Sequence, residues 1–102
     1  MRIRVGTLNA WALPEPFSRD VTPRMQAIGA HLADLDLDVM AFQELWTDEA
    51  RSIVAKAARR AGFAHHWHSA QGLGAGGGLL IVSRYPIEAA GFEPFRLSGH
   101  VE

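Results

Sequence analysis

The sequence predicts an α/β fold in which two parallel strands are followed by antiparallel ones, and three observations lead to this prediction. Short runs rich in aliphatic and β-branched residues recur along the chain, as is typical of strands. Longer segments between the first runs place apolar residues at helical spacing. Proline and glycine separate these elements and mark turns. The expected order is β-α-β-α-β-β-β, and its β-α-β start makes the first two strands parallel.

The first predicted strand covers residues 3–9, and a proline-containing loop over residues 10–21 follows it. Thr22 and Pro23 then indicate a helix start, with Thr22 as the N-cap and Pro23 at the first helical position. The apolar residues that recur at helical spacing after this start are Met25, Ile28, Leu32 and Leu35.

The second predicted strand covers residues 37–44, and a second helix opens at Thr47. The acidic residues Asp48 and Glu49 favour a helix start because they lie beside the positive end of the helix dipole. We expect Gly62 just beyond the carboxyl end of this helix. The apolar stripe of the helix consists of Ala50, Ile53, Val54, Ala57, Ala58 and Ala61.

Shorter segments follow the second helix. We expect a strand over residues 63–68, a glycine-rich loop over residues 69–78 and a strand over residues 79–83. A turn at Tyr85 and Pro86 precedes a last strand over residues 87–97. The spaced glycines formally fit a dinucleotide-binding loop, but such a loop must lead into a helix. Because a strand follows here, we expect a mobile connection instead.

Two of the predicted strands are apolar on both faces, over residues 39–42 and 79–82. This pattern is typical of strands that are covered on both sides, whereas two helices cover only one side. We therefore expect a second layer, from the carboxyl-terminal half of the domain or from another chain, over Val39, Phe42 and residues 79–82. The chain is predicted to be half of a larger sandwich.

Composition excludes several classes of function. A chain of 102 residues forms one domain or part of one. A net charge of -1 and a pI near 6.5 give no sign of a polyanion-binding surface. The absence of cysteine excludes disulfide and thiol chemistry. With no signal-like segment and no apolar run of about 18 residues, we expect a cytoplasmic protein without a transmembrane segment.

Asn9 and Glu44 are the candidate metal ligands. Each lies at the end of a predicted strand, and parallel neighbours would bring the two together at the carboxyl edge of the sheet, where open α/β sheets place ligands. A carboxylate with oxygen-bearing neighbours suits Mg²⁺, which keeps several waters and binds substrate phosphates. The alternative is that Glu44 is a solvated strand-end carboxylate and Asn9 a turn residue.

Further candidates for substrate contacts are aromatic and imidazole side chains. Trp11 and Trp46 each lie two residues beyond a proposed ligand and can wall the mouth of a site or serve in packing. His66 and His68 share one strand face, and a pair at this spacing can bind zinc. The alternative is a solvated or substrate-facing strand end.

Three stretches resemble the endonuclease/exonuclease/phosphatase superfamily, which has the DNase I-like fold. They are residues 7–11 (TLNAW), 39–46 (VMAFQELW) and 77–87 (GGLLIVSRYPI). Within the superfamily, Asn-x-Trp after the first strand, Glu-Leu-Trp after the second and the His-His pair near residue 65 look most like neutral sphingomyelinases.

The resemblance implies that residues 1–102 are the amino-terminal part of a four-layer α/β sandwich. Asn9 and Glu44 would hold Mg²⁺ or Mn²⁺, which would polarise a phosphodiester. Family members activate the attacking water with His and Asp residues of the carboxyl-terminal half, whose Asp-x-Asn and Asp-His motifs are absent here. We therefore assign no catalytic residue in this chain and expect it to supply only part of an active site.

The expected function is hydrolysis of a phosphodiester, as in sphingomyelinase-like cleavage of a phospholipid headgroup. One alternative is a nuclease of the same superfamily, which the lack of clustered basic residues disfavours. The other is a non-catalytic fragment or binding module.

Overall fold

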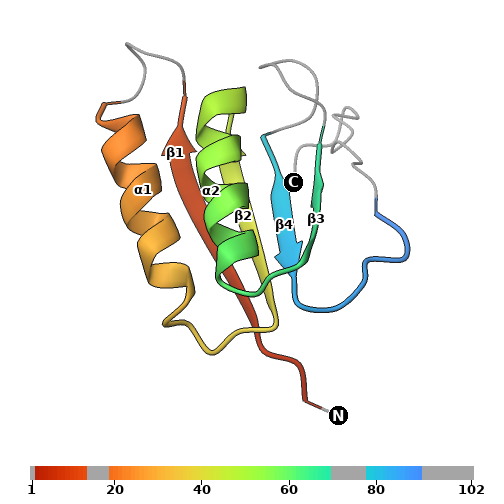
Figure 1. Ribbon diagram of the computed structural model, residues 1–102. Coiled ribbons are helices and arrows are strands. Elements are labelled where there is room, and N and C mark those ends of the chain that lie inside the picture. The colour runs from red at the N-terminus through yellow and green to blue at the C-terminus, as the bar shows by residue number, and fades with distance from the viewer. Residues whose placement is uncertain (1, 14–18, 70–77, 91–102) are drawn as a thin grey trace, which may run out of the picture.

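The computed structural model describes residues 2–13, 19–69 and 78–90 of the chain. In these residues four strands form one sheet, and two helices pack on it (Figure 1). The elements are β1 (Val5–Ala12), α1 (Val21–Leu32), β2 (Val39–Leu45), α2 (Asp48–Arg60), β3 (His65–His68) and β4 (Leu80–Ser83).

The sheet has the strand order β1-β2-β4-β3. β1 and β2 are parallel, with Asn9 opposite Gln43, and β4 is antiparallel to both β2 and β3. The predicted parallel start and antiparallel continuation are therefore confirmed. β1, β2 and β3 all run in one direction, so their carboxyl ends share one edge, which we call the carboxyl edge.

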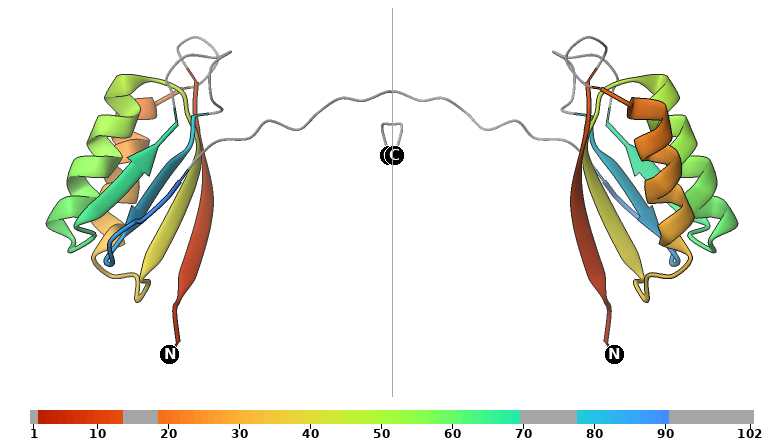
Figure 2. Two further views of the ribbon diagram at one scale, coloured as in Figure 1. Left: turned by 90° about the vertical axis from the view of Figure 1, so that its right-hand side faces the viewer. Right: turned by 90° about the vertical axis from the view of Figure 1, so that its left-hand side faces the viewer.

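Both helices lie on the same face of the sheet (Figure 2). The core forms between them and the sheet, and its largest fully buried side chains include Phe42, Met25 and Leu80. α1 and α2 approach closely at Gly29, where an added Cβ would lie 2.6 Å from the Cβ of Ala57. Glycine is needed at this crossing because no side chain fits between the helices.

The predicted ends of α2 are confirmed. Thr47 is the N-cap, and its Oγ1 accepts a hydrogen bond of 3.1 Å from the backbone N–H of Ala50. At the other end Gly62 has φ 99°, and the backbone N–H of Phe63 donates to Ala58 O at 2.9 Å. This is the Schellman arrangement, which satisfies carbonyls that the helix leaves without partners.

The predicted start of α1 was wrong by two residues. The helix begins at Val21, and its N-cap is Asp20, which has φ 52° and makes no side-chain capping bond. Thr22 lies inside the helix, where its Oγ1 is 3.4 Å from Glu49 Oε1. The helix ends at Leu32, so Leu35 lies beyond it and is exposed. The hydroxyl that the local signal assigned to a cap contacts α2 instead.

Strand boundaries differ from the prediction in several places. β2 covers Val39–Leu45 rather than residues 37–44, and β3 begins at His65 rather than at residue 63. β1 begins at Val5 rather than residue 3 and continues to Ala12, through residues that were expected to form a loop. Residues 87–90 form no strand, so this part of the predicted last strand was wrong. Residues 91–97 and most of the glycine-rich loop, residues 70–77, lie outside the described part of the chain.

The sequence predicted a second layer over the apolar residues of β2 and β4, but the helices already cover some of them. Phe42, Leu80 and Val82 are fully buried under the helices, so they need no second layer. Val39 and Ile81 alternate with these residues along β2 and β4, so they lie on the face without helices, where they are only partly exposed. Of the residues expected to need a second layer, Val39 and Ile81 thus remain on the face without helices.

Arg84 joins the elements at the amino end of β2. Its Nε donates to Leu37 O at 2.8 Å and its Nη1 to Ala61 O at 3.1 Å. Its guanidinium carbon lies 4.2 Å from the centroid of the Phe63 ring. One cation thus connects the start of β2, the carboxyl end of α2 and the segment before β3.

Candidate metal site at the carboxyl edge

The carboxyl edge brings Asn9 and Glu44 together, as their strand-end positions predicted. Asn9 Nδ2 donates a hydrogen bond to Glu44 Oε2. Asn9 Oδ1 accepts a 3.0 Å bond from the backbone N–H of Trp11, which orients the amide so that its NH₂ group faces the carboxylate. Asn9 is exposed and Glu44 half-buried, so the pair remains open to solvent and to a ligand.

A β-bulge in β1 makes this arrangement possible. Asn9 pairs with Gln43, but the next pair is Ala12 with Leu45, so β1 holds one extra residue. Trp11 lies within the bulge at φ 48°, a conformation that costs a bulky residue about 1–3 kcal/mol. Such strain persists only where surrounding contacts hold it.

Glu44 is also held in a left-handed conformation, with φ 60°. The next residue, Leu45, donates its backbone N–H to Gly78 O at 2.9 Å. An added Cβ at Gly78, which has φ 62°, would lie 3.0 Å from the backbone of Leu45. Gly78 therefore packs against β2 directly behind Glu44 and restrains it.

The donors fit a hard divalent cation better than zinc. Glu44 contributes a carboxylate and Asn9 an amide oxygen with a second lone pair. Among the described residues, no three His, Cys, Asp or Glu side chains come together as a metal site. Zinc takes three or four protein ligands, whereas Mg²⁺ is commonly held by one or two carboxylates with water and phosphate oxygens.

The two tryptophans differ in their surroundings. Trp11 is 51% exposed, and its ring lies beneath the guanidinium of Arg24, at 5.2 Å. Trp46 continues the pairing of β2 with β1 through a 3.1 Å bond from its N–H to Ala12 O. Its Nε1 is buried without a partner in the described residues. Trp11 thus lies beside the candidate site, and its role in substrate binding stays a prediction.

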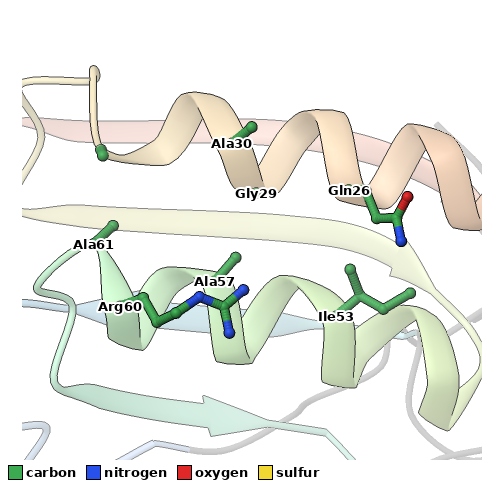
Figure 3. A pocket seen from close by; sticks show the side chains of 8 residues that line it. Gln26, Gly29, Ala30, Ile53, Ala57, Arg60 and Ala61 are labelled. Carbon is green, nitrogen blue, oxygen red and sulfur yellow. The ribbon is translucent and has the colours of Figure 1, made fainter.

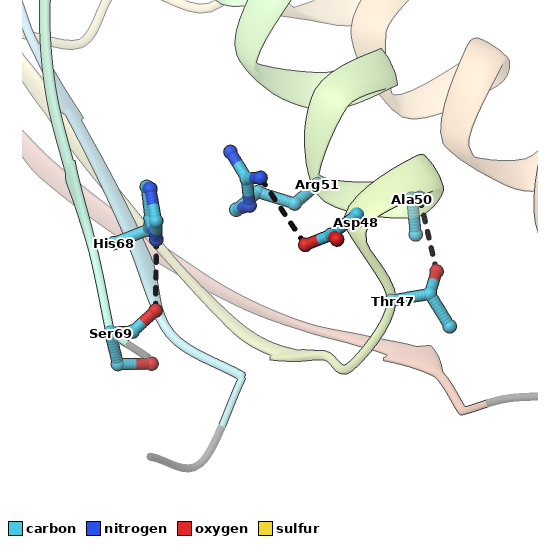
Figure 4. Close-up of polar contacts among 6 residues, drawn as sticks. All are labelled: Thr47, Asp48, Ala50, Arg51, His68 and Ser69. Carbon is cyan, nitrogen blue, oxygen red and sulfur yellow. Dashed lines mark hydrogen bonds and ion pairs between the residues drawn. The ribbon is translucent and has the colours of Figure 1, made fainter. Parts of the chain in front are cut away.

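His66 and His68 share a strand face, as expected, with nearly parallel rings whose centroids are 6.4 Å apart. They pair with Val82 and Leu80, whose side chains face the helices, so they lie on the other side of the sheet from Asn9. His68 Nδ1 is 2.8 Å from Ser69 O, while Arg51 contacts Asp48 nearby in α2 (Figure 4). The structure does not bring these histidines to Glu44.

A surface hollow of about 310 Å³ lies between the two helices. Small side chains and the longer Gln26, Ile53 and Arg60 line it (Figure 3). It lies on the helical layer, away from the sheet edge that holds Asn9 and Glu44, and it contains no carboxylate among its lining residues. The hollow is therefore separate from the candidate metal site.

Sequence reasoning missed three contributors to this edge. Gln43 Nε2 donates to Thr7 Oγ1 at 2.8 Å across the two parallel strands. Gly78 supports Leu45, and Arg24 binds the carbonyls of the bulge, Ala10 O and Trp11 O, at 2.9 Å each. No local signal identifies Arg24 in the sequence, since both of these bulge carbonyls lie more than ten residues away along the chain.

The sequence of this chain is similar to those of known proteins. Residues 6–101 match the profile of the Endonuclease/Exonuclease/phosphatase family. A Drosophila melanogaster protein named "Putative neutral sphingomyelinase" is 32% identical over 98% of this chain, and a Caenorhabditis elegans protein of the same name is 33% identical over 96%. An inositol phosphosphingolipids phospholipase C of Schizosaccharomyces pombe is 31% identical over 95%. The chain spans only 22–23% of the length of these relatives.

Solved structures support the same fold. A β-hairpin deletion mutant of β-toxin from Staphylococcus aureus superimposes with a TM-score of 0.70 over 85% of this chain and 37% of the toxin, at 17% identity. An endonuclease/exonuclease/phosphatase family protein from Leptotrichia buccalis gives 0.57 over 86% of this chain and 39% of its own, at 15% identity. The half-sandwich expectation agrees with these partial overlaps. The chain belongs to the endonuclease/exonuclease/phosphatase family.

Proposed function

We propose that this chain is the amino-terminal part of a Mg²⁺- or Mn²⁺-dependent phosphodiesterase that cleaves the headgroup of a phospholipid, as a sphingomyelinase does. The contact between Asn9 and Glu44 at the carboxyl edge carries the proposal. It joins a carboxylate at this edge to an oriented amide, within a family of hydrolases. The names of the relatives support a sphingolipid substrate.

Glu44 would hold the cation through its carboxylate. Asn9 would add its amide oxygen as a second ligand, while its NH₂ group orients the carboxylate of Glu44. The bound metal would polarise the phosphodiester and neutralise charge on the transferring phosphoryl group. Restraint of Glu44 by Gly78 and of Asn9 by the Trp11 amide limits reorganisation of the ligands. Preorganisation of this kind is how a site stabilises developing charge.

The remaining chemistry is proposed to come from the carboxyl-terminal half of the domain, which would also cover the exposed face of the sheet. This proposal is supported by the short span of the chain relative to its relatives. Among the described helices, none is long and apolar enough to cross a membrane. Access to lipid would then depend on the surface around the carboxyl edge, where Trp11 is exposed.

The test uses the full-length protein, meaning the polypeptide that contains this chain together with its carboxyl-terminal half. Sphingomyelin hydrolysis in mixed micelles is measured across a Mg²⁺ titration for wild type, Glu44→Gln and the control Glu88→Gln. Glu88 is an exposed glutamate outside the strands. We expect Glu44→Gln to lose about 100-fold or more in turnover, as removal of one preorganised charge-stabilising group does, and Glu88→Gln to match wild type.

The alternatives give different results in the same assay. Hydrolysis of duplex DNA in preference to sphingomyelin would identify a nuclease. Binding of sphingomyelin vesicles without hydrolysis at any Mg²⁺ concentration would identify a non-catalytic module. Unchanged turnover in Glu44→Gln would refute the metal role.

A further inference from the structure

We propose that Arg24 is a positioning residue for the candidate metal site, an inference that rests on the proposed function. Arg24 lies in the first turn of α1 and is half-buried against the carboxyl edge. It is not a proposed ligand. It acts by holding the β1 bulge, whose backbone in turn orients Asn9.

The guanidinium of Arg24 uses all three of its nitrogen atoms on backbone carbonyls. Nε donates to Arg19 O, Nη1 to Ala10 O and Nη2 to Trp11 O, each at 2.9 Å. The same group lies over the Trp11 ring. A planar fork of fixed geometry sets the relative positions of the atoms it binds, so Arg24 fixes both bulge carbonyls against α1.

These carbonyls belong to the residues that the bulge removes from regular pairing, between Asn9 and Ala12. Trp11, held there at φ 48°, directs its N–H to Asn9 Oδ1, and the NH₂ group of Asn9 then meets Glu44. Contacts therefore run from Arg24 through the Trp11 backbone and Asn9 to the carboxylate. Without Arg24, Trp11 is expected to relax to negative φ, which turns its N–H away from Asn9.

If Arg24 had a purely structural role, its loss would lower stability without changing the response to Mg²⁺. Arg84 serves as the comparison for such a role. Arg84 also binds backbone carbonyls and stacks on an aromatic ring, but at the amino end of β2. If Arg24 only stabilises the fold, its loss should resemble the loss of Arg84. If it positions the site, its loss should weaken the response to Mg²⁺ as well.

The experiment compares Arg24→Met, Arg24→Lys and the control Arg84→Met in the full-length protein. Three quantities are measured: the Mg²⁺ concentration for half-maximal sphingomyelin hydrolysis, the thermal midpoint without metal, and hydrogen exchange of the peptide covering residues 9–12. For Arg24→Met we expect a 10–100-fold rise in the half-maximal Mg²⁺ concentration, as for residues that orient metal ligands, and faster exchange in that peptide.

Arg24→Lys keeps the charge but has one nitrogen in place of three, so we expect a smaller rise. It replaces Arg24→Met as the deciding variant if the latter does not fold. Arg84→Met should lower the thermal midpoint and leave the Mg²⁺ response and the 9–12 exchange unchanged. The inference is overturned if the Arg24 variants lower only the thermal midpoint.

Glu44→Gln separates this inference from the proposed function. Loss of activity in Glu44→Gln with a normal Mg²⁺ response in both Arg24 variants refutes the role of Arg24 alone. Wild-type activity and Mg²⁺ response in Glu44→Gln refute the proposed function, and the metal role of Arg24 with it.

Discussion

The two ends of the parallel strand pair β1 and β2 are held by the same chemistry with different consequences. At the amino end, Arg84 binds the carbonyls of Leu37 and Ala61. At the carboxyl end, Arg24 binds the carbonyls of Ala10 and Trp11. In each case a guanidinium also stacks on an aromatic ring.

The difference lies in the backbone that each arginine holds. The carbonyl of Ala61 ends a regular helix with an ordinary glycine turn, so Arg84 adds stability to a conformation that is already favourable. The carbonyl of Trp11 belongs to a bulky residue at positive φ, next to the candidate ligand Asn9. Similar arginine–carbonyl contacts can therefore stabilise the fold at one end and fix the geometry of a site at the other. Four predictions test this difference.

The largest expected effect is the loss of the amino-end contact. Arg84→Met removes two hydrogen bonds from a charged donor and a cation–π contact, and we expect the free energy of unfolding to fall by about 3 kcal/mol. Urea denaturation of the full-length protein measures it. A change below about 1 kcal/mol would mean that water replaces the guanidinium easily.

The glycines at the two ends should differ in their tolerance of a side chain. In Gly78→Ala the new Cβ meets the backbone of Leu45 and the residue must keep positive φ, so we expect a loss of about 2 kcal/mol. In Gly62→Ala the Cβ meets the movable end of Arg84, and about 1 kcal/mol is expected. Equal losses, measured by thermal unfolding, would contradict the distinction between fixed and movable neighbours.

Two threonines near the carboxyl edge allow a smaller contrast. Thr47→Ala removes the N-cap bond of α2 and should cost about 1 kcal/mol. Thr22→Ala, in a residue that does not cap α1, should change stability by less than about 0.5 kcal/mol. Paired denaturation curves decide, and a larger loss for Thr22→Ala than for Thr47→Ala would contradict this contrast.

The last contrast concerns the middle of the sheet, on the face without helices, where we expect only a small effect in the 102-residue chain. Because Ile81 is partly exposed there, Ile81→Ala should cost about 1 kcal/mol or less in the 102-residue chain. If the carboxyl-terminal half covers this face, the loss should rise to about 2–5 kcal/mol in the full-length protein. Similar small losses in both would show that the face stays exposed.

Much of this architecture could be predicted because the signals are local. Helical spacing in α2, its cap at Thr47 and its end at Gly62 all depend on neighbouring residues. The meeting of Asn9 and Glu44 followed from one topological rule, that β-α-β places two strands parallel. Their role as metal ligands stays a prediction.

The errors came from contacts between distant segments. Phe42 belongs to a run that is apolar at every position, and only the docking of the helices assigns it to the covered face. The cap predicted at Thr22 was wrong because α1 begins at Val21 with Asp20 as its N-cap, and Thr22 contacts Glu49 of α2 instead. The continuation of β1 to Ala12 depends on pairing with Leu45, which no local pattern in residues 10–12 indicates.

The sequence by itself determined the order of elements, the parallel start of the sheet and the strand-end positions of Asn9 and Glu44, because periodicity, caps and chain direction are local properties. Tertiary structure decided how those two side chains are aimed. Arg24 of α1 restrains the bulge and the positive φ of Trp11, and Gly78, two residues before β4, restrains Glu44. These features arise only when α1 and Gly78 pack against the strand ends. Strained backbone is specified by contacts from elsewhere in the chain, since no residue adopts it from its own preference.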